Sequence, residues 1–259
     1  MNIIQINKFS DLHDGERIIF CKTDFLLEEF EKIKKLKHEV VLISGNSDYC
    51  ITDQIVAHAP QNIKKWFCQN RHSDSFILQS IPLGIENTEE CKRAGHGYVW
   101  AHAKEKHAIL SDPPRKDSTK FIFANFSVKN NIHHRASFRQ KAIELDHVTW
   151  QEPNLNYPDY VNSVLEHEAV LCAQGNGPGD NHRIYETLYL SRVPITVSYI
   201  QYRYLHNLFP TVLLTSYDQL DNKEKLKSEI DKSRKQINKK YLDFDYWKDM
   251  ILDTAKDLQ

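Results

Sequence analysis

Short apolar runs typical of β-strands alternate with amphipathic stretches typical of α-helices along most of the chain. Residues 16–21 form the first strand-like run, residues 25–37 have apolar side chains at helical spacing, and residues 38–44 are strand-like again. The same alternation resumes at residue 120 and continues to residue 197. Strands separated by helices build parallel sheets, because each helix carries the chain back to the end at which the preceding strand began. The sequence therefore predicts an α/β fold with doubly wound parallel sheets.

Two adjacent prolines divide the chain near its middle. Pro113 and Pro114 follow a helix-like stretch at 96–110 and forbid its continuation. A chain of 259 residues is long enough for one large α/β domain or for two smaller ones. We predict two similar Rossmann-like domains, residues 1–115 and 116–259, although the halves show no clear sequence repeat. The last helix, beginning near Asp243, is expected to pack back across a domain surface.

The charge balance and the cysteines exclude several classes of protein. Lys and Arg number 34 against 35 Asp and Glu, so a general nucleic-acid surface, which needs a basic excess, is not expected. The five cysteines contain no C-x-x-C pair, and the thirteen histidines contain no helical i,i+4 pair with a third ligand nearby. We therefore expect no metal site, no cofactor and no disulfide framework. No apolar run is long enough for a transmembrane segment, so we expect a soluble, cytoplasmic protein.

Glycine is concentrated at one place in the chain. Only 8 of the 259 residues are glycine, and Gly175, Gly177 and Gly179 lie within five residues of one another. The segment 169–197 around them has the pattern of a strand, a glycine-rich loop, a helix and a second strand. The first-turn N–H groups of such a helix lack intrahelical partners, and the helix dipole is positive there. The segment therefore predicts an anion-binding site.

The residues that begin this helix point to a particular anion. Asp180 or Asn181 is expected to cap the helix, and His182 and Arg183 follow in its first turn, where a cation is unfavourable unless an anion binds. Glu186 lies on the same face one turn later. A guanidinium can hold a diphosphate through two oxygens, and a carboxylate can accept hydrogen bonds from a ribose diol. The pattern favours a nucleoside diphosphate; the alternative is an ordinary Arg–Glu pair on an exposed helix.

Two common phosphate-binding loops fit the sequence less well. No Lys-Ser or Lys-Thr follows the glycines, so an ATPase P-loop is not indicated. The glycines are spaced G-x-G-x-G, not G-x-G-x-x-G, and they occur late in the chain, not after its first strand. A dinucleotide-dependent oxidoreductase is therefore disfavoured as well.

The segment 175–197 resembles the donor-binding segment of exostosin-like glycosyltransferases. Segments 64–70, 81–87 and 121–135 add to the likeness, which covers about half the chain. The residues that match the family pattern are Gly175, Asn176, Gly177, Asp180, His182, Arg183, Glu186 and Val193-Pro194-Ile195.

The resemblance implies a GT-B fold, in which two Rossmann-like domains face each other across a cleft. It also implies transfer of a sugar from a nucleoside-diphosphate sugar to a glycan or glycolipid acceptor, without an obligatory metal. Basic groups and a helix N-terminus can then stabilise the departing diphosphate. On this interpretation Arg183 and His182 contact the diphosphate, Glu186 contacts the ribose, and the loop at 175–179 leaves room for the donor.

Three residues after the strand-like run at 120–124 complete the expected donor site. Asn125 and Ser127 are expected to line the cleft, and Arg135 is expected to reach a phosphate. A loop-capping role is the alternative for Asn125.

An inverting transfer also needs a base that takes the proton of the acceptor hydroxyl, best placed on the opposite domain. Asp48 follows the strand at 38–44, at the carboxyl end where parallel sheets bind ligands, and is our first choice; its alternative is a turn-stabilising role. Glu86 is the second choice. Retaining GT-B enzymes often carry E-x7-E, whereas Pro194 stands eight residues after Glu186, which favours inversion.

Two rival functions remain open at this stage. One is a non-catalytic module that binds a nucleotide sugar or a glycan on the same scaffold. The other is a nucleotide-sugar epimerase of GT-B shape, which would convert a donor without any acceptor.

Overall fold

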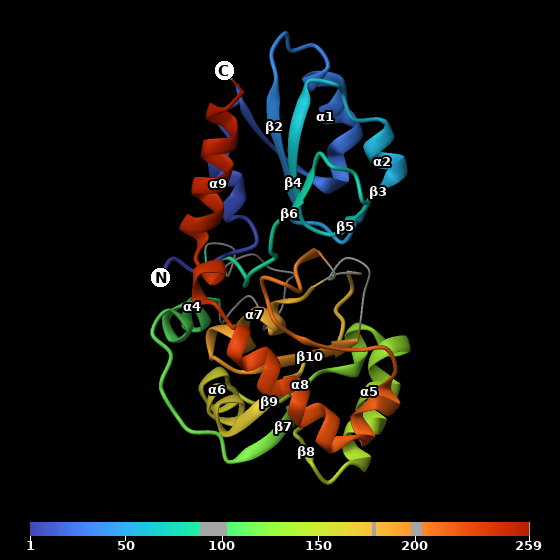
Figure 1. The fold of residues 1–259 in the computed structure, drawn as a ribbon, viewed down its shortest axis with the longest axis vertical. Helices are drawn as coiled ribbons and strands as arrows, with labels where there is room; N and C mark the ends of the chain where they lie inside the picture. Colours follow the sequence, from blue (N-terminus) through green and yellow to red (C-terminus); the bar gives the residue numbers. More distant parts are fainter. Residues whose placement is uncertain (89–102, 178–179, 198–203, 259) are drawn as a thin grey trace.

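Two parallel β-sheets, each with its own helices, make up the protein. In the computed structural model the first sheet is built from residues 18–80 and the second from residues 120–214, and the two units lie one above the other (Figure 1). The residues that the structure describes are 1–88, 103–177, 180–197 and 204–258.

The first sheet adds its strands in chain order, and every neighbouring pair is parallel. Its strands are β1 (Ile18–Lys22), β2 (Val40–Gly45), β4 (Ile63–Cys68) and β6 (Leu78–Ser80). A separate pair is formed by β3 (Ile51–Thr52) and β5 (Arg71–His72). The helices of this unit are α1 (Leu26–Ile33) and α2 (Asp53–Ala57).

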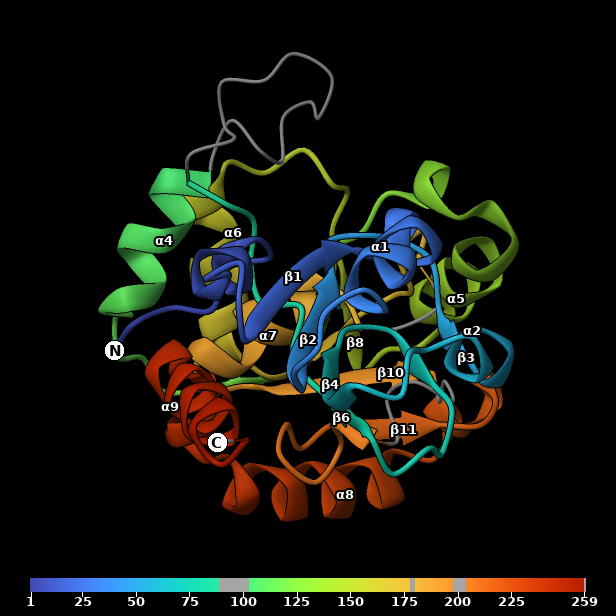
Figure 2. The same ribbon diagram turned by 90° about the horizontal axis from the view of Figure 1, so that it is seen from above.

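Both faces of the first sheet are covered, and this explains the continuous apolar run of β2. Val40 and Leu42 pack in the core beneath α1, whereas Val41 and Ile43 pack in the core that contains Trp247 of α9 (Phe244–Lys256). Figure 2 shows α1 and α9 on opposite sides of β2. A strand buried on both faces needs apolar residues at successive positions. The final helix of the chain therefore completes the core of the first unit.

The second sheet is also parallel, and its strand order is β11-β10-β9-β7-β8. From β7 the chain moves to one side to form β8 and then returns to the other side to form β9, β10 and β11. The order therefore reverses between β7 and β9. These strands are β7 (Lys120–Ala124), β8 (Val148–Trp150), β9 (His167–Leu171), β10 (Val193–Val197) and β11 (Val212–Leu214).

Helices cover both faces of the second sheet as well. One core contains Ile122 of β7 with side chains of α5 and α8, and the other contains Phe123 with side chains of α6 and α7. These helices are α5 (Ile132–Glu144), α6 (Tyr157–Glu166), α7 (His182–Tyr189) and α8 (Lys223–Gln236). Short 3-10 helices lie at η1 (Lys8–Leu12), η2 (Thr23–Phe25), η4 (Val128–Asn130), η6 (Tyr217–Asp221) and η7 (Lys239–Leu242).

Several segments join the two units. Tyr189 of α7 accepts a hydrogen bond from Ile4 N at 3.0 Å and donates one to Leu242 O at 2.7 Å. Helix α4 (Ala103–Ser111) precedes the predicted domain boundary but packs against α7 of the second unit. Gly84 has φ +74°, and a Cβ placed on it would lie 2.4 Å from Ile4 O. Only glycine therefore fits where the segment after β6 passes against Ile4.

The predicted α/β class is confirmed: two parallel-sheet units lie one above the other. The strand order reverses in the second sheet, as expected of a doubly wound sheet, but not among the four strands of the first. The boundary predicted between residues 115 and 116 falls between α4 and β7. Asp243, at the start of the last helix, caps α9 through a hydrogen bond from Asp245 N at 3.1 Å to its Oδ1.

Candidate functional site

A cavity of about 460 Å³ lies where the chain leaves β7 and β9 and where α7 begins. In an open parallel sheet, ligands bind at the carboxyl ends of the strands where the strand order reverses, and β7 and β9 are the two strands at that point. Eight of the predicted site residues line the cavity: Glu86, Asn125, Ser127, Arg135, Gly175, His182, Arg183 and Glu186.

The N-terminus of α7 forms part of the cavity wall and has no side-chain cap. Asn181 holds the N-cap position, but its Nδ2 donates to Ala173 O at 3.3 Å and its side chain accepts no helix N–H. The predicted cap by Asp180 or Asn181 is therefore wrong. The N-cap side chain thus accepts no first-turn N–H group of α7, and this end of the helix, where an anion is favoured, lies beside the cavity.

Asp180 makes a contact between the two units instead of a cap. Its Oδ2 accepts hydrogen bonds from Leu83 N at 3.1 Å and from the Tyr185 hydroxyl. Burial raises the pKa of Asp180 above its ordinary value, against the effect of these hydrogen bonds. The carboxyl group thus ties the loop before α7 to the segment that follows β6, and Asp180 does not line the cavity.

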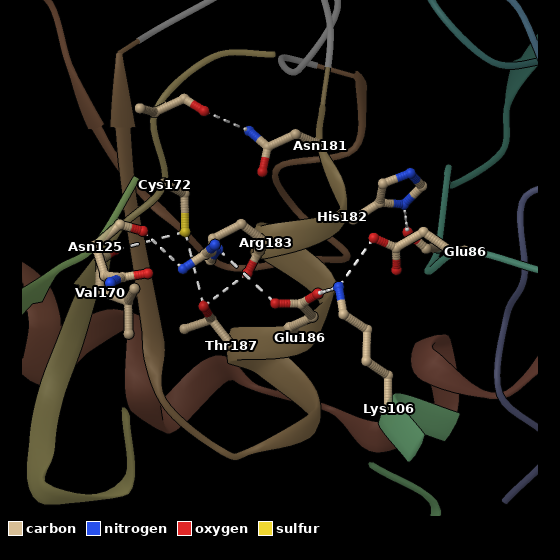
Figure 3. Close-up of polar contacts among 12 residues, drawn as sticks. Glu86, Lys106, Asn125, Val170, Cys172, Asn181, His182, Arg183, Glu186 and Thr187 are labelled. Carbon is tan, nitrogen blue, oxygen red and sulfur yellow. Dashed lines mark hydrogen bonds and ion pairs between the residues drawn. The ribbon is translucent and has the colours of Figure 1, made fainter. Parts of the chain in front are cut away.

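Arg183 and Glu186 face the cavity, so the alternative of an ordinary exposed pair is wrong. Glu186 is only 2% exposed, and its Oε2 lies 3.8 Å from Arg183 Nε. The Arg183 guanidinium donates to Asn125 O at 2.9 Å (Figure 3). Its Cζ also stacks 4.3 Å from the Tyr160 ring centroid. Burial alone would lower the pKa of Arg183, but Tyr160 and Glu186 raise it above its ordinary value. The guanidinium is therefore a fixed positive charge.

His182 joins the second unit to the first at the edge of the cavity. Its Nδ1 lies 2.7 Å from Gly84 O, and because a carbonyl oxygen only accepts, this contact places a proton on Nδ1. The imidazole ring is thereby held at the start of α7, between the two units.

Lys106 is a site residue that the sequence analysis missed. Its Nζ lies 2.9 Å from Glu86 Oε1 and 2.6 Å from Glu186 Oε1 (Figure 3). The three side chains are 11%, 1% and 3% exposed, and all three line the cavity. One signal could have found Lys106: it sits at helical spacing between Ala103 and Leu110, the two apolar residues of α4 that are also buried.

The three charged groups stabilise one another electrostatically. Burial alone would raise the pKa of Glu86, but the charges of His182 and Lys106 lower it below its ordinary value. Burial alone would lower the pKa of Lys106, but Glu186 and Glu86 raise it above its ordinary value. Glu86 and Lys106 are therefore both ionised at neutral pH. A carboxylate with a lowered pKa accepts protons poorly, which weakens Glu86 as a base.

Asp48 lies outside the cavity wall, in an exposed position after β2, but touches the glycine-rich loop. A Cβ placed on Gly177 would lie 2.9 Å from Asp48 Oδ1, closer than a side chain can approach, whereas a Cβ on Gly175 would meet no atom nearer than Asn181 Cβ at 4.0 Å. The structure thus brings the preferred base and the loop together across the two units.

The remaining loop residues contribute less to the described site. Asn176 is exposed beside Gly177, outside the cavity wall. The third glycine of the predicted cluster, Gly179, lies outside the residues that the structure describes.

Arg135 and Asn125 organise the cavity wall. Arg135 donates to three carbonyl oxygens: from Nε to Gln174 O at 2.6 Å, from Nη1 to Ser127 O at 2.8 Å and from Nη2 to Ala173 O at 3.2 Å. It thereby fixes the loops after β7 and β9 to each other. The Asn125 side chain donates to Glu152 O at 2.9 Å and to Gln151 O at 3.2 Å, which holds the loop after β8.

Within the described part of the chain, no group of three His, Cys, Asp or Glu side chains is arranged to hold a metal ion. The helices in those same ranges include none with the length and apolar character needed to cross a bilayer.

Comparisons with known proteins give similarity in fold only. No protein-family model and no curated protein matches the sequence. Among solved structures, the spinosyn rhamnosyltransferase SpnG is 11% identical, with a TM-score of 0.42 over 85% of this chain and 68% of that chain. The GtfA/B complex is 10% identical, with a TM-score of 0.45 over 96% and 60% of the two chains. An α1,3-fucosyltransferase with GDP-fucose is 11% identical, with a TM-score of 0.34 over 89% and 81%.

Proposed function

We propose that the protein is a glycosyltransferase that transfers a sugar from a nucleoside-diphosphate sugar to a glycan or glycolipid acceptor. The observation that carries this proposal is the cavity at the reversal of strand order, into which the uncapped start of α7 brings Arg183. A helix N-terminus and a guanidinium together favour a phosphate group. The same residues match the exostosin-like pattern, and this resemblance supports the diphosphate of a nucleotide sugar as the anion.

The donor is oriented by residues of α7. Arg183 has five N–H donors, of which Asn125 O takes one, and in our proposal it binds the diphosphate together with His182 and the first N–H groups of the helix. Glu186, one turn deeper in the cavity, accepts hydrogen bonds from the ribose hydroxyls. Donor binding then competes with the contacts of Glu186 to Lys106 and Arg183.

The proposed reaction inverts the configuration of the transferred sugar. The acceptor oxygen attacks the anomeric carbon, the bond from that carbon to the diphosphate oxygen breaks, and the bonding electron pair leaves with the diphosphate. The acceptor proton passes to Asp48, which lies beside Gly177 of the glycine-rich loop. The positive end of α7, Arg183 and His182 stabilise the departing diphosphate in the place of a metal ion. Glu86, held by Lys106, is the weaker candidate for the base.

A product assay distinguishes this proposal from its rivals. The protein is incubated with UDP, GDP and CMP sugars, each with and without a mixture of glycan acceptors, and the products are identified by mass spectrometry. Release of nucleotide together with a glycosylated acceptor supports the proposal. Conversion of the donor sugar without acceptor indicates an epimerase, and a donor that raises the melting temperature but is not consumed indicates a binding module.

A further inference from the structure

One oxygen of a buried carboxylate in the cavity wall receives no hydrogen bond from any other residue that the structure describes. Glu86 is 1% exposed, and its Oε1 is bound by Lys106 Nζ at 2.9 Å. Its Oε2 is buried as well, but no other described residue donates a hydrogen bond to it. Buried polar atoms are nearly always hydrogen-bonded, because an unpaired buried acceptor destabilises the protein. Oε2 is therefore poised to receive a donor that the described residues do not supply.

The surroundings of Glu86 keep this carboxylate ionised. The described charged and titratable groups around the Glu86–Lys106 pair are His182, Arg183 and Glu186 on α7 and Tyr157 and Tyr160 on α6. Lys106 also lies 5.3 Å from the Tyr157 ring centroid, so this ring and the two carboxylates surround its ammonium group. An ionised carboxylate only accepts hydrogen bonds. The missing partner of Oε2 is therefore a hydrogen-bond donor.

The position of Glu86 indicates which kind of ligand group can donate a hydrogen bond to Oε2. Lys106 Nζ contacts both Glu86 Oε1 and Glu186 Oε1. The Glu86 carboxylate is therefore separated only by the Lys106 ammonium group from Glu186, the residue proposed to bind the ribose. A phosphate beside Glu86 would be repelled, since both groups are negative. A neutral ligand group that carries O–H donors, such as the sugar of a nucleotide sugar, satisfies the oxygen without repulsion.

We propose that Glu86 Oε2 accepts a hydrogen bond from a hydroxyl group of the donor sugar, and that Lys106 is the residue that positions Glu86 for this contact. The inference rests on the proposed function and names the part of the substrate that the first unit recognises. Glu86 acts by binding, with no transfer of a proton. Lys106 acts through Glu86, because its ammonium group is held by the two carboxylates.

Calorimetry with matched ligand pairs tests this assignment. UDP is compared with UDP-glucose and UDP-N-acetylglucosamine, and GDP with GDP-mannose, on the wild type and on the variant Glu86→Gln. The glutamine oxygen still accepts from Lys106, but its NH₂ group replaces the free acceptor. We expect affinity for the bound nucleotide sugar to fall at least tenfold in E86Q, as for other hydrogen bonds to charged groups, with affinity for the free nucleotide unchanged. Glu186 is proposed to bind the ribose, which both ligands contain. Glu186→Gln should therefore lower the affinities for the free nucleotide and for the nucleotide sugar by the same factor.

The role of Lys106 is tested by the pH dependence of the same binding. Against the effect of burial, the charges of His182 and Lys106 and the hydrogen bond from Lys106 lower the pKa of Glu86. Lys106→Met removes the second of these charges and the hydrogen bond, so the pKa of Glu86 rises and the acceptor is lost by protonation at a higher pH than in the wild type. In K106M the ratio of nucleotide-sugar affinity to free-nucleotide affinity should fall from pH 8 to pH 6, whereas the same ratio in the wild type stays level. Lys104→Met, at an exposed position of the same helix, is the matched control and should behave as the wild type.

The outcomes separate this inference from the proposed function. Wild-type protein that binds no member of the panel contradicts both. Wild-type binding combined with an E86Q variant that weakens nucleotide and nucleotide sugar equally, or neither, overturns this inference alone. If E86Q is not folded at the assay temperature, the double variant E86Q/K106M is measured in its place. This variant also removes the Lys106 ammonium group, which has lost one of its two carboxylate partners in E86Q. Its affinities for the free nucleotide and for the nucleotide sugar are compared in the same way.

Discussion

Lys106 of α4 and Glu186 of α7 form a buried ion pair of 2.6 Å, and Glu86, in the segment that follows β6, binds the same ammonium group at 2.9 Å. The three charges lie in the wall of the one cavity that also contains Arg183 and the start of α7. Contacts within this group therefore join the packing of the two units to the chemistry of the site, and both can be measured in the same variants.

Removal of the Lys106 ammonium should destabilise the protein. Lys106→Met leaves two buried carboxylates without their cation, and breaking a buried ion pair in this way costs about 3–5 kcal/mol. We expect a loss of this size in the free energy of unfolding from urea denaturation at pH 7. Lys104→Met should change it by less than about 0.5 kcal/mol, as surface substitutions usually do. Equal stability of the two variants would show that the ion pair does not form.

The acid stability of the protein should depend on Glu86. The folded protein lowers the pKa of Glu86 below its ordinary value of 4.5, against the opposing effect of burial. The resulting stability is therefore fully present above pH 4.5 and is lost as the pH falls through the folded-state pKa. The difference in unfolding free energy between wild type and Glu86→Gln should be constant from pH 7 to 5 and shrink below that range. A difference that grows on acidification would contradict the assigned direction.

A side chain at Gly177 should disturb Asp48, whereas one at Gly175 should not. A Cβ at Gly177 would lie 2.9 Å from Asp48 Oδ1, so Gly177→Ala must move either the loop or the carboxylate, whereas the nearest atom to a Cβ at Gly175 is 4.0 Å away. Displacement of a reacting group by about 1 Å can cost about a hundredfold in rate. We expect G177A to lower kcat/KM by about tenfold to a hundredfold and G175A to lower it far less. Steady-state kinetics on both variants give the comparison.

Asp48 should affect turnover and not donor affinity. The Asp48→Asn variant keeps the shape of the side chain but removes the proton acceptor, and a general base contributes about 10²–10⁴-fold to rate. We expect kcat to fall by that factor while the calorimetric Kd for the donor stays within about twofold of the wild type, a change below 0.5 kcal/mol. Full activity in D48N would move the base to another residue.

The parts of the fold that depend on local pattern could be predicted from sequence. The apolar run at 38–44 predicted the strand β2, and the glycine cluster before His182 located the loop and helix that meet the cavity. The contacts that could not be predicted join distant segments. Lys106 and Glu186 are 80 residues apart, and their contact depends on the packing of α4 against α7; Asp180 and Leu83 are 97 apart, and theirs depends on how the two units pack together.

Individual side chains also had partners that the sequence does not reveal. Arg135 was expected to reach a phosphate, and it lines the cavity, but its described hydrogen bonds go to three backbone carbonyls. Asp180 belongs to the family pattern, yet it binds Leu83 N and Tyr185 across the interface. In both cases the residue type and its place in the chain were informative, while the partner was set by the tertiary structure.

The central claim is that a nucleotide sugar binds at the start of α7 through Arg183. Calorimetric titration of the wild type and of Arg183→Ala with the UDP, GDP and CMP sugars tests this claim most directly, with Arg234→Ala, a surface ion-pair residue of α8, as the matched control. We predict that one donor binds the wild type and R234A equally, and that R183A binds it at least tenfold more weakly while remaining folded, as expected for loss of a charged hydrogen-bond donor. Equal donor affinity in folded R183A and wild type would contradict the claim.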